Sequence, residues 1–406
     1  MPKKNMAGWI SLFLYLTFFQ FYVFQAVKEV SYQNFKIFYL VSSFLIIGNF
    51  FYQIFSRGFD SSSSFFSYSL GLFLSLFCFQ LVVISILIVE DFFRLISFIS
   101  SSLNKSENII PNRRKFVSQI ALISGAIPFV GLIFGMIYGK YNYRVFKYEM
   151  DFDDLPKSFD GFKITHISDI HSGSLDNIEK VKYGIDLINQ QKSDVILFTG
   201  DLVNNKSNEL EKWKDIFKLM EAPLGKFSIL GNHDYGDYYD WKSKDEKIND
   251  FKKFMDYQEN MGFKLLMNES IYLEKNEEKI AILGSENWGR GFKKEGDLDK
   301  MISKINKDDF KILMTHDPSH WEEKVLNHKS RFQLTLSGHT HGMQFGIEIP
   351  GLIKWSPVKW RYKQWAGIYK KDKKILNVNR GFGYLAYPGR LGIYPEISVI
   401  TLRRRS

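Results

Sequence analysis

The sequence predicts two parts of different fold class, a group of transmembrane helices followed by a layered α/β domain. Two observations indicate this. In the first 150 of the 406 residues, Phe, Leu, Ile and Tyr are crowded into long stretches without a charged side chain. From about residue 144, short apolar runs alternate with charged segments of helical composition, as expected for strands that alternate with helices. We therefore place a membrane domain at 1–143 and a second domain at 144–406.

Four uncharged stretches are each long enough to cross a membrane. A hydrocarbon core of roughly 30 Å is spanned by about 20 apolar residues in a helix. The four predicted spans contain no Asp, Glu, Lys, Arg or His, which favours a membrane anchor over a transport path. They lie at about 7–27, 37–56, 66–89 and 117–138.

The charge is unevenly distributed. Residues 1–150 contain 13 of the 54 Lys and Arg residues and 6 of the 44 Asp and Glu residues, a net of +7. The remaining 41 and 38 leave residues 151–406 at only +3, so nucleic-acid binding is not expected. Cys78 is the only cysteine, which excludes an intrachain disulfide and a thiolate metal cluster.

The basic residues beside the apolar stretches indicate on which side of the membrane the second domain lies. Lys105 and the basic run at 113–115 follow the third stretch, and the positive-inside tendency places them in the cytoplasm. The segment NRRKFV at 112–117 also resembles a twin-arginine export signal. Lys3 and Lys4 favour the opposite orientation, because four spans leave both termini on one side. We favour a second domain that lies outside the cytoplasm.

Six short apolar runs in the second domain are predicted to be buried strands, several of them bounded by glycine. Segments such as 176–190 and 207–220 between them have helical composition. In such sheets, ligand sites collect beyond the carboxyl ends of the strands. The predicted strands are KITHIS (163–168), DVILFT (194–199), KFSILG (226–231), KIAILG (279–284), FKILMT (310–315) and FQLTLS (332–337).

Five of these strand ends carry Asp, Asn or His. A lone histidine is more often a core or surface residue than a ligand, but five of the eight histidines fall in these short segments. Carboxylate, imidazole and amide donors without thiolate suit Mn, Fe, Zn or Mg. The donors are too many for one tetrahedral ion and fit two ions that share a carboxylate, which is an arrangement for displacement at phosphorus. The segments are DIH (169–171), GD (200–201), GNHD (231–234), HD (316–317) and GHTH (338–341).

The motif series DIH, GDL, GNHD, THD and GHTH, in this order, resembles the calcineurin-like metallophosphoesterase superfamily over about 150–406. The resemblance implies a layered β-sandwich flanked by helices, with two divalent metal ions, of which Mn is favoured. It implies that one ion is held by Asp169, His171 and His341, and the other by Asn232, His316 and His339, with Asp201 as the bridge.

The same resemblance implies catalytic roles for two further residues. His233 is expected to be an unligated general acid or a transition-state stabiliser. Asp234 stands where much of the superfamily has Glu, and it is expected to orient His233.

The segment at 379–402 resembles the closing segment of the bacterial, often membrane-anchored branch of the superfamily. Some members of that branch are exported, and one cleaves the pyrophosphate of UDP-diacylglucosamine. The resemblance implies an integral protein of a bacterial cell membrane. In the usual GHTHGGQ motif this chain has Met343 in place of a glycine, so the substrates of the branch are not carried over.

A basic and aromatic segment, KWSPVKWRYKQW at 354–365, is a candidate membrane or substrate contact through Trp355, Trp360, Arg361 and Trp365. Tryptophan beside basic residues is typical of a membrane interface. The alternative is that the tryptophans pack against the sheet and the lysines are solvated.

The sequence therefore predicts a membrane-anchored phosphoesterase with a dinuclear metal centre. Its partners would be the lipid bilayer and a phosphorylated small-molecule or lipid substrate, and no obligate protein partner is evident. The alternative is a catalytically silent membrane sensor or transporter whose soluble domain binds metal or a phosphorylated ligand. The sequence leaves open the native metal and the choice between monoester, diester and pyrophosphate.

Overall fold

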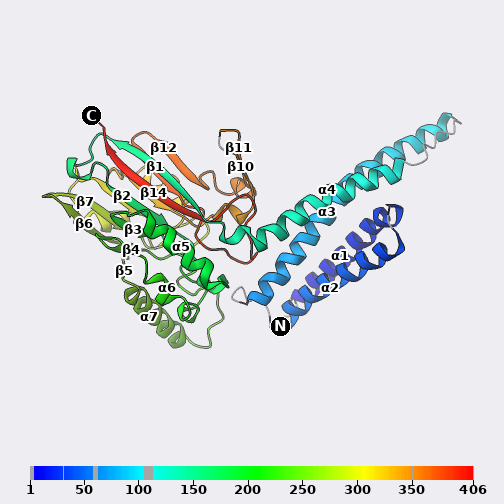
Figure 1. Cartoon of the computed structure of the whole chain (residues 1–406), viewed down its shortest axis with the longest axis horizontal. Helices are drawn as coiled ribbons and strands as arrows, with labels where there is room; N and C mark the ends of the chain where they lie inside the picture. The colour runs from blue at the N-terminus through cyan, green and yellow to red at the C-terminus, as the bar shows by residue number, and fades with distance from the viewer. Residues whose placement is uncertain (1–3, 31, 58–62, 105–112, 350, 406) are drawn as a thin grey trace. The chain divides into compact units, whose positions relative to one another are not determined.

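The computed structural model describes residues 4–30, 32–57, 63–104, 113–349 and 351–405 (Figure 1). The chain forms two compact units. The membrane unit comprises Met1–Asp60 and Tyr68–Gly135, and the α/β unit comprises Ser61–Ser67 and Met136–Ser406.

The membrane unit consists of long helices. Three of them are long and apolar enough to cross a membrane, over Gln33–Ser56, Ser64–Ser100 and Arg113–Ile137, and they overlap three of the predicted spans. The first predicted span, 7–27, falls within a helix whose side chains lie partly outside the described residues, so it stays a prediction. The helices are α1 (Lys4–Val30), α2 (Gln33–Arg57), α3 (Ser64–Asn104) and α4 (Arg113–Ile137).

Helix α3 is longer than the sequence predicted. We expected the third span to end near residue 89, where charged residues begin, but the helix continues to Asn104. The charged segment contains no helix breaker, and Arg94 pairs along the helix with Glu90 at 3.9 Å and with Asp91 at 3.4 Å. Pairs spaced by three or four residues support a helix, so the loss of apolar character did not end it.

The α/β unit contains two six-stranded sheets and a small ribbon. Each of the six predicted strand segments contains an observed strand. In order, the first sheet is β1 (Arg144–Phe152), β14 (Glu396–Arg404), β2 (Lys163–Ile167), β3 (Val195–Phe198), β4 (Lys226–Ser228) and β5 (Phe263–Leu265). The second is β12 (Gly367–Lys371), β13 (Lys374–Val378), β9 (Leu334–Ser337), β8 (Lys311–Met314), β7 (Glu278–Gly284) and β6 (Glu269–Lys275). The ribbon pairs β10 (Ile347–Ile349) with β11 (Ile353–Trp355).

The main core lies between the two sheets. Ile164 and Leu197 from the first sheet share one buried cluster with Ile312 and Leu336 from the second. Helices α5 (Ile178–Gln190), α6 (Lys214–Phe217) and α7 (Lys244–Asn260) lie beside the first sheet (Figure 1). The short α8 (Leu298–Ile302) and a helical turn at Trp321–Val325 pack on the second. These layers confirm the predicted β-sandwich flanked by helices.

The strand directions bring the predicted motifs to one edge. Strands β2, β3 and β4 run parallel in the first sheet, and β7, β8 and β9 run parallel in the second. The carboxyl ends of parallel strands lie at the same edge of a sheet. All five motifs that are predicted to supply metal ligands follow such ends.

Because His320 is buried, we expect the stability of the fold to depend on pH. This residue is 1% exposed, its Nδ1 lies 2.8 Å from the Thr315 hydroxyl, and its ring stacks on Trp288 at 4.9 Å. Burial, with the charge of Lys324, lowers its pKa from 6.5 to about 3. The unfolded chain therefore binds the proton first as the pH falls, so this contribution is complete above pH 6.5 and is lost progressively toward pH 3.

We expect His320 to account for a loss of about 2 kcal/mol of unfolding free energy between pH 7 and pH 5. His320→Asn should make the slope of stability against pH shallower by that amount. Urea unfolding of the detergent-solubilised chain, followed by tryptophan fluorescence, measures it. His328→Asn, in a partly exposed position nearby, is the control and should not flatten the slope. Equal slopes in wild type and His320→Asn would contradict the prediction.

Candidate metal centre

The predicted ligands lie on short loops that leave the strands in strained backbone conformations. Five of the seven have positive φ, at a cost of about 1 to 2 kcal/mol each for a residue other than glycine. Such strain persists where the surrounding structure enforces it, and it is typical of functional sites. The five are Asp169 (φ 52), His171 (φ 49), Asp201 (φ 58), His339 (φ 69) and His341 (φ 49).

Two motif glycines are required because the loops approach so closely. A Cβ at Gly338 would lie 1.9 Å from the Ser168 hydroxyl, and a Cβ at Gly231 would lie 2.1 Å from Asp201 Oδ1. Gly338 of GHTH therefore lets the strand ends of the two sheets meet, and Gly231 of GNHD lets the loops after β3 and β4 of the first sheet meet.

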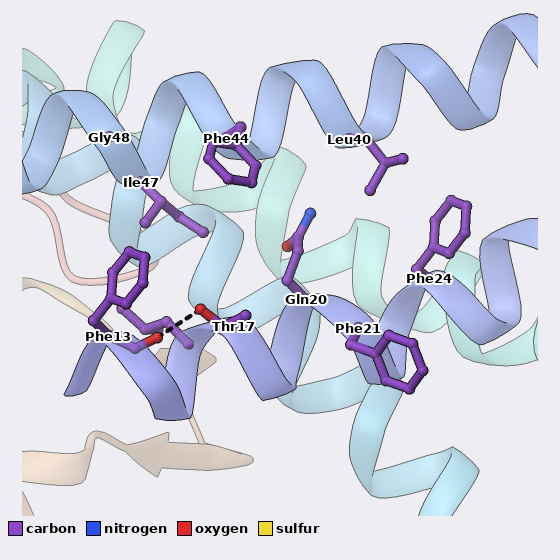
Figure 2. A pocket seen from close by; sticks show the side chains of 10 residues that line it. Phe13, Thr17, Gln20, Phe21, Phe24, Leu40, Phe44, Ile47 and Gly48 are labelled. Carbon is purple, nitrogen blue, oxygen red and sulfur yellow. Dashed lines mark hydrogen bonds between the residues drawn. The ribbon is translucent and has the colours of Figure 1, made fainter. Parts of the chain in front are cut away.

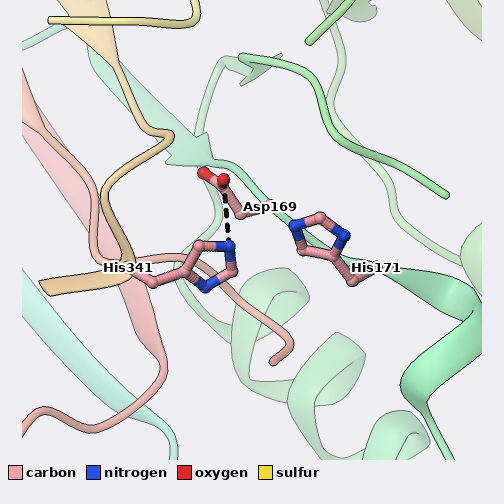
Figure 3. Close-up of side chains that lie close together, drawn as sticks. All are labelled: Asp169, His171 and His341. Carbon is pink, nitrogen blue, oxygen red and sulfur yellow. Dashed lines mark ion pairs between the residues drawn. The ribbon is translucent and has the colours of Figure 1, made fainter. Parts of the chain in front are cut away.

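The first cluster joins Asp169, His171 and His341 (Figure 3). His341 Nε2 lies 3.2 Å from Asp169 Oδ1, and the rings of His171 and His341 are 4.9 Å apart. One ligand atom from each residue lies within 4.8 Å of the others. Among the described residues, Asp169 Oδ1, His171 Nε2 and His341 Nε2 are buried without a hydrogen-bond partner. Buried polar atoms are rarely left unpaired, so this cluster fits a cation.

The second cluster joins Asp201, His316 and His339 within the same distance limit. His316 Nε2 lies 3.1 Å from Asp201 Oδ2, and His339 Nδ1 lies 3.3 Å from His316 Nε2. Asn232 follows Gly231 on the neighbouring loop, and its Oδ1 is also buried with no hydrogen-bond partner in the described part of the chain. An amide oxygen added to these donors is suitable for a divalent ion.

Asp201 connects the two clusters. Its Oδ2, which lies beside His316, is also 3.6 Å from His171 Nε2 in the first cluster. Its Oδ1 accepts a hydrogen bond from the backbone N–H of His233 at 2.9 Å. One carboxylate is therefore within reach of both clusters.

Burial and the neighbouring charges set the protonation of the ligands. Burial lowers the pKa of His171 well below 6.5 and that of His339 to about 4, so both rings are neutral, as a metal ligand must be. Burial opposes ionisation of Asp169, yet the adjacent His341 and His316 hold its pKa below the ordinary value. Burial also opposes protonation of His316, but Asp201 and Asp169 outweigh it and raise the pKa to about 10.

Further contacts hold the second nitrogen of each histidine ring and so fix the ring orientation. His171 Nδ1 donates to Asn204 Oδ1 at 3.1 Å, and His316 Nδ1 donates to the Thr199 carbonyl at 2.7 Å. The fully buried Arg390 contacts His341 Nδ1 at 3.0 Å through Nη2.

His339 is held by a chain of two hydrogen bonds. Its Nε2 lies 2.9 Å from the Tyr362 hydroxyl, which donates to Asp317 at 3.1 Å. The sequence analysis missed Asn204, Tyr362 and Arg390 in these supporting roles. Arg390 lies in the closing segment that resembled the bacterial branch, which was its only signal.

His233 has the position expected of a group beside the metal ligands. Its Nδ1 donates to the Asn204 carbonyl at 2.7 Å, and its ring meets the His171 ring edge-on at 5.0 Å. It is partly exposed, in contrast to the buried His171. Its Nε2 is therefore the nitrogen directed away from the bond to Asn204.

The expected role of Asp234 requires correction. We expected its carboxylate to orient His233, but Asn204 holds that ring. Asp234 instead accepts four backbone N–H bonds at 2.8 to 3.2 Å, which tie the loops after β3 and β4 together. A short carboxylate next to a tight turn reaches backbone donors before it reaches a side chain one residue away. The four donors are Asp201, Leu202, Val203 and Gly231.

The residues of the basic and aromatic segment at 354–365 differ in exposure, so some fit a surface contact and one fits packing in the core. Trp365 is 4% exposed and packs with Val358, Tyr362 and Ile393, so it is a core residue and its expected surface contact is wrong. Trp360 is 77% exposed. Trp355 is partly exposed and Arg361 is exposed.

Comparison with known proteins identifies the family. Residues 162–343 match the family described as calcineurin-like phosphoesterase, and residues 6–140 match the one described as probable calcineurin-like phosphoesterase, transmembrane domain. The uncharacterized metallophosphoesterase YkuE of Bacillus subtilis is 30% identical over 301 residues, which cover 72% of this chain and 98% of YkuE. The chain belongs to the calcineurin-like phosphoesterase family. The predicted superfamily and enzyme class are confirmed.

Two further relatives extend the match. The uncharacterized metallophosphoesterase Cj0846 of Campylobacter jejuni is 27% identical over 377 residues, 91% of each chain. The transmembrane protein with metallophosphoesterase domain of Danio rerio is 24% identical over 323 residues, 76% of this chain and 70% of the relative. This metallophosphoesterase is thus a membrane-anchored phosphoric ester hydrolase of a family that uses divalent metals.

Proposed function

We propose that this metallophosphoesterase uses two divalent ions, with Mn favoured, to hydrolyse a phosphate ester or pyrophosphate bond of a lipid or lipid-linked substrate. The observation that carries the proposal is the position of Asp201, whose Oδ2 lies within 3.6 Å of a ligand nitrogen in each of two histidine and carboxylate clusters. Two ions, when bound, would activate water and polarise the phosphoryl group. We assign one ion to Asp169, His171 and His341, the other to Asn232, His316 and His339, and Asp201 to both.

We assign His233 the transfer of a proton to the leaving oxygen. Its Nδ1 is held by the Asn204 carbonyl, which leaves Nε2 for this transfer. The backbone N–H of His233 donates to Asp201, so the acid is positioned by the same carboxylate that joins the two clusters. Geometry of this kind is what general acid catalysis requires.

The β10–β11 ribbon supports a lipid substrate, because its apolar face is exposed and its charged face is turned toward the protein. Ile347 pairs with Trp355 and Ile349 with Ile353, so these four side chains share one face. Ile347, Ile349 and Ile353 are 50%, 47% and 45% exposed, and Leu352 between the strands is 74% exposed. We call Ile347, Ile349, Leu352 and Ile353 the apolar ribbon face.

The opposite face of the ribbon carries the charges and is tied to the protein. Glu348 accepts from Arg380 Nη2 at 2.6 Å, and Lys354 donates to the Ala366 carbonyl at 2.5 Å. A ribbon on a water-soluble surface would present the opposite arrangement. Exposed apolar patches mark interaction sites, and a membrane-anchored enzyme has the bilayer as its nearest apolar phase. The ribbon begins shortly after His341, so it supports a lipid surface close to the metal centre.

Turnover by the full chain in phospholipid vesicles tests the function. With Mn added, we expect hydrolysis of both bis-p-nitrophenyl phosphate and a vesicle-embedded lipid phosphate, and we expect a chelator to abolish both. Hydrolysis of water-soluble substrates alone would contradict the lipid assignment. No metal-dependent turnover of any phosphate ester or pyrophosphate would contradict the whole proposal.

Replacing Ile347, Ile349 and Leu352 together with Ser is expected to lower lipid hydrolysis about tenfold or more, because burial of these side chains in the bilayer is lost. Bis-p-nitrophenyl phosphate turnover should stay unchanged, since the ribbon carries no ligand. The matched control replaces Ile178, Leu219 and Ile248, which are 37%, 53% and 52% exposed, with Ser. An equal loss in both triple variants would show that the ribbon has no special role.

We also propose that the enzyme is an integral protein of a bacterial cell membrane whose α/β unit, which carries the metal centre, lies outside the cytoplasm. The basic residues at 113–115 support this orientation. To test this orientation, Glu179→Cys is introduced on a Cys78→Ser background and intact cells are treated with a membrane-impermeant maleimide. We expect the new cysteine to be labelled. Protection of this cysteine from the reagent would show the opposite orientation.

A further inference from the structure

The membrane unit contains a groove that the phosphoesterase chemistry does not use. It lies between α1 and α2 and encloses about 220 Å³ (Figure 2). Phe13, Phe21 and Phe24 of α1 and Phe44 of α2 line it, so its wall is almost entirely apolar. Phe13, Phe21 and Phe44 are 52%, 64% and 72% exposed, so the groove is bordered by surface that a bilayer would cover.

The Gln20 amide points into this apolar groove. The Gln20 side chain is only 8% exposed, and Figure 2 shows it directed between the two helices. Its Oε1 accepts from Gln80 and, at 3.3 Å, from the Tyr39 hydroxyl, while Gln80 also donates to Tyr39 at 3.2 Å. Within the described residues, Gln20 Nε2 has no hydrogen-bond partner. An unpaired amide donor in apolar surroundings is costly, so the groove lacks one acceptor.

Gly48 leaves one end of the groove open. A Cβ added at this position in α2 would meet nothing within 4 Å. Glycine in membrane helices commonly allows close helix contact, but no described atom approaches this one. The space above Gly48 is therefore room for a ligand instead of a packing interface.

Gln20 lies near the middle of the groove, with Gly48 toward one end and Phe24 toward the other, and polar contacts lie nearby (Figure 2). Tyr22, two residues further along α1, donates to Asp91 at 2.5 Å, and Asp91 lies 3.9 Å from Arg114. Charged residues of membrane helices gather toward the interface, where the ester groups of lipids begin. The groove thus carries an amide donor partway along its length, at Gln20, and has apolar lining on both sides of it.

We propose that this groove binds one acyl chain of a membrane glycerolipid, whose ester carbonyl accepts a hydrogen bond from Gln20 Nε2. The volume exceeds that of an apolar cavity of about 150 Å³ that holds benzene, so a segment of several carbon atoms fits. The Thr17 hydroxyl, which also lines the groove, donates to the Phe13 carbonyl at 2.8 Å, which leaves Gln20 as the donor for the ester (Figure 2). This site is separate from the proposed hydrolysis and does not depend on it.

Photocrosslinking of the full chain in detergent micelles tests the proposal. The probe is phosphatidylglycerol with a diazirine within one acyl chain, and the competitors are ester-linked and ether-linked phosphatidylglycerol, which differ in the carbonyl. We expect adducts between residues 13 and 48, and we expect the ester lipid to compete about tenfold better than the ether lipid.

Three variants separate the parts of the site. Gln20→Leu should remove the difference between ester and ether lipids, and Gly48→Leu, which fills open space, should lower the adduct yield about tenfold. Gln25→Leu is the matched control, because Gln25 is on the same helix outside the groove and donates to the Phe21 carbonyl. It should leave both results unchanged.

The thermal unfolding temperature of each variant checks that it folds, and Gly48→Leu gives a second test should Gln20→Leu fail to fold. Equal competition by ester and ether lipids in wild type would overturn the hydrogen bond to Gln20. Adducts spread evenly over the helices, or not lowered by Gly48→Leu, would show surface lipid only and overturn the groove site.

Discussion

Asp201→Asn is expected to lower hydrolysis of bis-p-nitrophenyl phosphate by about 10⁴-fold, which corresponds to about 5.5 kcal/mol of transition-state stabilisation. The Asp201 Oδ2 atom lies 3.1 Å from His316 Nε2 in one cluster and 3.6 Å from His171 Nε2 in the other. An amide oxygen has the same shape but no charge, so it holds two cations poorly. Asn keeps an acceptor for the backbone N–H of His233, so the loop should stay in place.

The measurement combines turnover with metal content. In the Asp201→Asn variant we expect the bound Mn per chain, determined by mass spectrometry of the metal, to fall together with kcat. Asp186→Asn on the exposed surface of α5 is the control and should match wild type. Full turnover by the Asp201→Asn variant, or two ions retained with unchanged affinity, would contradict a bridging role.

His233→Asn is expected to lower kcat by about 10² to 10³-fold at unchanged metal content, the range of a lost general acid. His233 contacts the centre through its backbone and ring, with its Nδ1 bonded to Asn204, so its removal takes no ligand from either cluster. A proton donor is needed most when the leaving oxygen is strongly basic. The loss should therefore be large for an alkyl phosphodiester and small for a p-nitrophenyl ester.

This dependence on the leaving group distinguishes two roles. Single-turnover rates for a series of aryl and alkyl phosphodiesters should show a steeper dependence on leaving-group pKa in His233→Asn than in wild type. A loss of equal size for every ester would assign His233 to stabilising charge in the transition state instead of donating a proton. His328→Asn serves as the control substitution and should have wild-type rates.

The local pattern of the sequence was sufficient to predict the layered domain. Segments such as VILF at 195–198 and LTLS at 334–337 are fully buried strands, and short apolar runs bounded by glycine have few other stable arrangements. The motif order then predicted the candidate metal ligands, and these lie close together because parallel strands bring their carboxyl ends to one edge. The membrane spans followed from length and the absence of charge, but the end of α3 did not, since a helix continues through charged residues that pair along it.

Only the tertiary structure decided which side chains meet across distant segments. Asp234 was expected to hold His233, but its oxygens reach the backbone of the β3 loop 31 to 33 residues earlier in the chain. Arg390 and Tyr362 reach His341 and His339 from segments that carry no motif. Trp360 and Trp365 have the same local composition, yet one is exposed and the other buried. Periodicity and composition indicate whether a segment is buried. The partner of a polar or aromatic side chain depends on how segments that are distant in the sequence pack together, and the residues around that side chain in the sequence do not determine this packing.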